Sequence, residues 1–76
     1  MDLDNLIVMA NKIGQFFAAQ PDRDEALAGI AEHVKKFWEP RMRTQILAAV
    51  DTEAGAGMSD IVAAALTTHR AMLQPK

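Results

Sequence analysis

Apolar residues recur at intervals of three and four positions along four stretches of this chain, and prolines or glycines separate these stretches. Such spacing gathers apolar side chains on one face of an α-helix. No stretch shows the alternation of polar and apolar residues, with β-branched enrichment, that is typical of a strand. The sequence therefore predicts an all-α fold, a small bundle of about four short helices, in which residues 1–76 form a single domain.

Local signals indicate where the four predicted helices begin and end. The first spans residues 3–17, and Asp22 is a suitable N-cap for the second. Pro40 has the backbone angle of a first helical position, so a third helix should begin there. It should end before the sequence EAGAG, whose glycines can supply a left-handed cap. Ser59 should then cap a last helix that continues to about Met72.

The sequence KKFWEPRMR, residues 35–43, holds the only Trp and four of the eight lysines and arginines. In a structural interpretation, Pro40 makes a tight corner and the aromatic side chains cap the core beneath it. The lysines then favour the negative end of the second helix. Arg41 and Arg43 do not fit this interpretation, because the first turn of a helix prefers carboxylates. Because the sequence departs twice from this helix-dipole preference, we expect Arg41 and Arg43 to have a role other than stabilising the helix.

The second interpretation is a contact surface for another protein, since Trp, Arg and Met are enriched at interfaces. The predicted interface residues are Lys35, Lys36, Trp38, Arg41, Met42 and Arg43, and the predicted structural corner consists of Phe37, Glu39 and Pro40. The two interpretations are compatible if Phe37 lies inside and Trp38 is partly exposed.

Several classes of function are disfavoured by composition. Cysteine is absent, which excludes disulfides, thiolate zinc sites and iron–sulfur ligation by this chain. His33 and His69 lack other ligands at suitable spacing, so we predict no metal site, no cofactor-binding residue and no catalytic residue. A net charge of −2 argues against nucleic-acid binding. The apolar runs are too short for a membrane span and no export signal is apparent, so we expect a soluble protein.

Three stretches of the sequence resemble the small delta subunit of bacterial NAD-dependent, molybdenum-containing formate dehydrogenases. They are DNLIVMANKIGQFF (4–17), PDRDEALAGIAEH (21–33) and HVKKFWEPRMR (33–43). The most specific part runs from Phe37 to Met42, and the resemblance extends from Asp4 to about His69.

The resemblance implies a cytoplasmic accessory subunit without catalysis of its own. In that family the alpha subunit carries the molybdenum bis-guanine-dinucleotide cofactor and iron–sulfur clusters. The beta subunit carries FMN and the NAD site, and the gamma subunit a further cluster. The delta subunit is implied to support assembly, stability or cofactor maturation. We hypothesise that the interface residues contact the alpha subunit, with the face formed by Asn5, Lys12 and Gln15 as the alternative surface.

Two further functions stay open from the sequence. The four cations of residues 35–43 could contact the phosphates of the molybdenum cofactor directly, although no glycine-rich cradle accompanies them. A small apolar-rich bundle could also associate with itself when its partner is absent.

Overall fold

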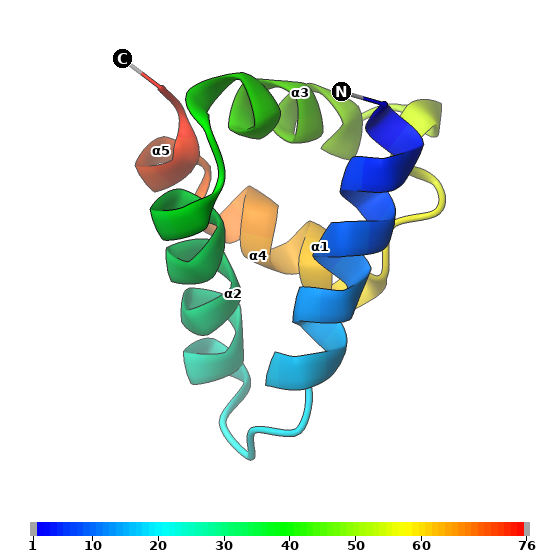
Figure 1. Cartoon of the computed structure of the whole chain (residues 1–76). Helices are drawn as coiled ribbons and strands as arrows, with labels where there is room; N and C mark the ends of the chain where they lie inside the picture. The colour runs from blue at the N-terminus through cyan, green and yellow to red at the C-terminus, as the bar shows by residue number, and fades with distance from the viewer. Residues whose placement is uncertain (1, 76) are drawn as a thin grey trace.

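The computed structural model describes residues 2–75, and all of its regular elements are helical. They are α1 (Leu3–Phe17), α2 (Arg23–Phe37), α3 (Pro40–Val50), the 3-10 helix η1 (Glu53–Gly55), α4 (Asp60–Thr68) and α5 (Arg70–Leu73). Figure 1 shows α1 and α2 side by side and antiparallel, with α3 across their upper ends and α4 behind them. The predicted all-α bundle is confirmed.

The first three helices begin where their local signals predict. The Asp22 carboxylate accepts the backbone N–H groups of Asp24 at 2.8 Å and Glu25 at 3.2 Å, so it caps α2. Asp2 caps α1 in the same way by accepting the N–H of Asp4. Pro40 occupies the first position of α3, as predicted.

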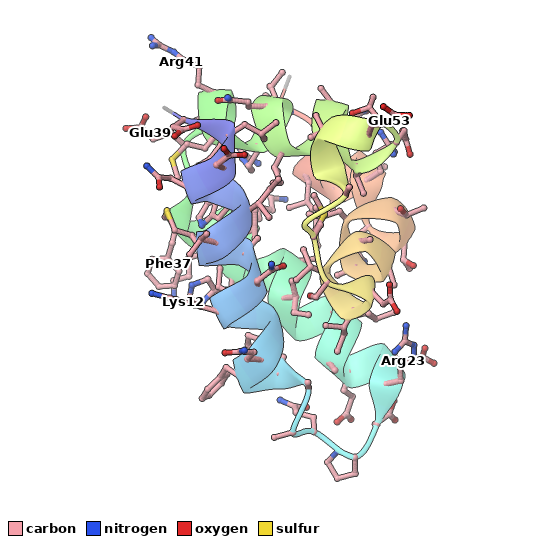
Figure 2. All side chains as sticks on the ribbon, turned by 90° about the vertical axis from the view of Figure 1, so that its right-hand side faces the viewer. Lys12, Arg23, Phe37, Glu39, Arg41 and Glu53 are labelled. Atoms are coloured by element: carbon pink, nitrogen blue, oxygen red, sulfur yellow. The ribbon has the colours of Figure 1, made fainter. Side chains whose placement is uncertain are left out.

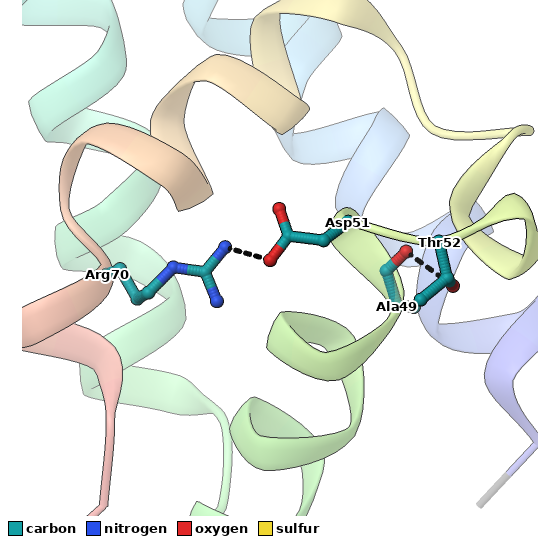
Figure 3. A network of polar contacts seen from close by, with 4 residues as sticks. All are labelled: Ala49, Asp51, Thr52 and Arg70. Atoms are coloured by element: carbon teal, nitrogen blue, oxygen red, sulfur yellow. Dashed lines mark hydrogen bonds and ion pairs between the residues drawn. The ribbon is translucent and has the colours of Figure 1, made fainter.

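The EAGAG segment departs from the prediction, because none of its glycines adopts a left-handed conformation. Residues 53–55 instead form η1, and the Thr52 hydroxyl caps it by accepting the N–H of Ala54 while donating to the carbonyl of Ala49 (Figure 3). Gly55 is required for space and not for its φ angle, since a Cβ there would collide with the Ala49 carbonyl oxygen. The predicted left-handed cap is therefore wrong.

The last predicted helix is broken at His69 into α4 and α5. This break directs Leu73 into the core, where it is fully buried. It also brings Arg70 to Asp51 at the end of α3, where the two side chains form an ion pair at 2.7 Å (Figure 3). Ser59 precedes α4 as predicted, but its hydroxyl makes no capping hydrogen bond.

The core contains side chains from every α-helix. The largest fully buried ones are Leu6, Val34, Ile30, Ile46, Val62, Leu66 and Leu73. Gly14 allows α1 to approach α4, because a Cβ at this position would lie 2.6 Å from Cγ2 of Val62. These contacts hold α1 and α2 in front of α4 and leave the other faces of both helices exposed (Figure 1).

Candidate interaction surface

The corner between α2 and α3 places its two aromatic residues differently from the prediction. Trp38 ends α2 with an extended backbone and belongs to the core, with only 6% of its surface exposed. Phe37 is 64% exposed. The expectation of Phe37 inside and Trp38 partly outside is wrong, because the chain leaves the helix at Trp38 ahead of Pro40 and turns the indole inward.

Phe37 forms a stacked unit with two neighbours on α2. Its ring centroid lies 4.8 Å from that of His33, and the Lys36 ammonium lies 5.5 Å from the Phe37 centroid, within the range of a cation–π contact. Figure 2 shows Phe37 and Lys12 on the same side of the molecule. The exposed aromatic residue of the corner is thus Phe37, and Lys36 is the cation next to it.

The four cations of the corner face three directions. Lys36 accompanies Phe37, whereas Arg41 projects away from the body of the molecule at the start of α3 (Figure 2). Lys35 and Arg43 line a hollow of about 280 Å³ beside residues 71–75. The Arg43 Nε atom is buried there and has no hydrogen-bond partner among the described residues. Met42 packs half-buried against the core, so the predicted interface residues do not form one continuous patch.

A groove between α1 and α2 was not anticipated from the sequence. We call it the α1–α2 groove; its volume is about 460 Å³ and its lining consists of Lys12, Ile13, Phe16, Phe17 and His33. Phe16 is 74% exposed and meets Phe17 edge to face, with ring centroids 5.1 Å apart. Phe17 in turn packs over Gly29, where a Cβ would lie 2.5 Å from the ring.

A sequence signal for this groove existed in the spacing of Met9, Ile13 and Phe16, which places them along one flank of α1. Helical periodicity by itself favours the core face for Phe16, because it follows the apolar residues of α1 at three- and four-residue intervals. Only the position of α2 shows that this flank opens to solvent.

Within residues 2–75, no three His, Cys, Asp or Glu side chains are grouped so that they could hold a metal ion. His33 stacks on Phe37, and His69 forms the break between α4 and α5. Over the same residues, no helix is both long enough and apolar enough to cross a bilayer.

Residues 5–66 match the family model of the NADH-dependent formate dehydrogenase delta subunit, FdsD. The chain belongs to this family. The matched region contains the α2–α3 corner and the α1–α2 groove, and it ends within α4. No curated protein matches the chain, and no solved structure does. Family membership confirms the resemblance based on residues 4–43 and makes the chain a delta subunit of a formate dehydrogenase.

Proposed function

We propose that this delta subunit is a non-catalytic accessory protein that binds the large alpha subunit of a cytoplasmic formate dehydrogenase. The alpha, beta and gamma subunits would carry the molybdenum bis-guanine-dinucleotide cofactor, the iron–sulfur clusters, FMN and the NAD site. The delta subunit would support assembly, stability or cofactor maturation by holding the alpha subunit. The family match supports this proposal.

The α2–α3 corner carries the proposal structurally. Phe37 leaves most of its ring in water although a folded chain gains by burying it, and aromatic and arginine side chains are frequent at interface hot spots. Arg41 lies in the first turn of α3, where a cation opposes the helix dipole. A carboxylate of the alpha subunit would offset this local cost by pairing with Arg41.

The test is co-purification of the alpha subunit with tagged delta subunit carrying Phe37→Ala and Arg41→Glu. We expect retained alpha subunit to fall about tenfold or more, because an aromatic contact is lost and a charge pair is reversed. Arg23→Glu is the matched control, since Arg23 is also an exposed arginine in a first helical turn but lies at the opposite end of the molecule (Figure 2). Equal retention by both variants would contradict the role of the corner.

A second candidate function is direct contact with the phosphates of the molybdenum cofactor. The hollow lined by Lys35 and Arg43 favours it, because neither cation has an ion-pair partner in the described part of the chain. Calorimetric titration with guanosine diphosphate tests this alternative. Binding that Arg43→Gln abolishes would support it, and the absence of measurable heat would contradict it.

A further inference from the structure

We infer that the α1–α2 groove docks an amphipathic helix of a partner protein, whose apolar side chains enter the groove and whose flanking carboxylates pair with Lys12 and Lys36. This inference rests on the proposed function in one respect, namely that the partner is the alpha subunit. The chemistry of the docked helix is inferred from the groove itself.

The apolar character of the docked helix follows from the side chains that border the groove. Four large apolar side chains are exposed within residues 2–75, and three of them, Met9, Phe16 and Phe37, lie along this face. The fourth, Val8, does not line the groove. Exposed apolar side chains gathered in one place are uncommon on proteins that act alone and mark binding surfaces.

The shape of the groove fits a helix. Its walls are the two antiparallel helices α1 and α2 (Figure 1). Ile13 and Phe17 pack from the groove onto the cluster of buried residues that includes Leu27 and Ile30. The side-chain ridge of a third helix can pack into the furrow between two neighbouring helices, and the volume of about 460 Å³ leaves room for side chains of such a helix. Insertion of an amphipathic helix into an apolar groove is a recurring mode of recognition.

The acidic character of the docked helix follows from the charges around the groove. Lys12 lines it and Lys36 lies over the neighbouring Phe37, and neither lysine has an ion-pair partner among the described residues. No carboxylate belongs to the described lining of the groove. Carboxylates on the incoming helix would supply the missing charge, which fixes orientation and speeds association.

The same charges disfavour a second copy of this chain as the occupant. In a two-fold symmetric dimer the same patch meets itself. Contact through this face would therefore bring Lys12 and Lys36 of one copy against the lysines of the other, which costs free energy.

The experiment compares three variants of the tagged delta subunit in the complex with the alpha subunit. Phe16→Ser removes the main apolar contact. The double substitution Lys12→Glu and Lys36→Glu reverses the charge beside the groove from positive to negative. We expect each to lower retained alpha subunit by about tenfold or more, and the wild-type complex to weaken as salt is raised. Val8→Ser is the control, because it removes an exposed apolar side chain outside the groove. Circular dichroism checks that every variant is folded.

A photo-reactive benzoylphenylalanine at position 16 then identifies the occupant within the purified complex. We expect a cross-link to a helix of the alpha subunit with apolar residues at three- and four-residue spacing and flanking Asp or Glu. A cross-link to a second delta chain, or to a segment without carboxylates, would overturn the inference.

The variants also separate this inference from the proposed function. Should Arg41→Glu release the alpha subunit while Phe16→Ser retains it at wild-type level, the groove inference fails and the proposed function stands. Should the wild-type chain retain no alpha subunit, both fail together.

Discussion

At the residue scale, Asn11 joins α1 to the loop before α4 with both ends of its carboxamide. Its Nδ2 donates to the carbonyl of Gly57, and its Oδ1 accepts the N–H of Ser59, each at 2.9 Å. The two bonds satisfy backbone groups that are 46 and 48 residues away in the sequence. Asn11 thus fixes the start of α4, where the Ser59 hydroxyl provides no cap.

Replacement of Asn11 by Ala should therefore destabilise the protein. We expect the free energy of unfolding in urea to fall by about 1–2 kcal/mol, because the partly buried N–H of Ser59 and the exposed carbonyl of Gly57 both lose their partner. Gln15→Ala is the control, since Gln15 is an exposed amide on the same helix. Similar denaturation midpoints for both variants would show that Asn11 does not hold the loop.

The two aromatic residues at the corner should respond oppositely to truncation. Trp38→Ala should lower the free energy of unfolding by about 3–5 kcal/mol, because it leaves a cavity in the core. Phe37→Ala should change it by less than about 0.5 kcal/mol, since the ring is mostly exposed. Urea denaturation measures both, and the native Trp38 fluorescence should resist acrylamide quenching. A larger loss of unfolding free energy for Phe37→Ala than for Trp38→Ala would mean that Phe37, and not Trp38, is the buried residue of the corner.

At the scale of elements, Gly14 sets the distance between α1 and α4. An added Cβ would lie 2.6 Å from Cγ2 of Val62, a fully buried β-branched side chain that cannot rotate away easily. We expect Gly14→Ala to destabilise the protein despite the better helix propensity of alanine, since overpacking costs about 1–3 kcal/mol. Gly57→Ala is the control, because its nearest neighbour would be 3.8 Å away. A higher midpoint for Gly14→Ala in thermal unfolding would contradict this packing.

The ion pair between Asp51 and Arg70 connects α3 to α5 but should stabilise them little. Its side chains are 65% and 32% exposed, and pairs in contact with water contribute about 0–1 kcal/mol. Arg70→Gln should therefore lower the free energy of unfolding by less than about 1 kcal/mol, and the difference should shrink in high salt. A loss that high salt leaves unchanged would show that Arg70 acts through packing instead.

The parts of the fold that the sequence predicts are those set by neighbours in the chain. The Asp22 cap and the Pro40 start depend on a few adjacent residues, and both are found in the structure. Helical periodicity places both Phe37 and Trp38 on the apolar face of α2, and it anticipates neither the exposure of Phe37 nor the break at His69, which depend on how distant helices pack. The same holds for the α1–α2 groove, which exists only because α2 lies where it does.

At the scale of the whole molecule, a 76-residue bundle exposes one face that combines aromatic rings and unpaired cations. The groove and the corner meet at Phe37, which stacks on the groove residue His33. A surface of this kind is costly for a protein that acts alone and typical of one that is covered by a partner. This surface supports the proposal that the delta subunit binds a larger subunit.

The most direct test is expression of the alpha subunit with and without this chain, followed by measurement of molybdenum per purified alpha subunit and of alpha retained on tagged delta. We expect the two chains to co-purify and the molybdenum content or stability of the alpha subunit to fall when the delta subunit is absent. Failure of the two chains to co-purify, together with an unchanged molybdenum content of the alpha subunit, would contradict the accessory role proposed for the delta subunit.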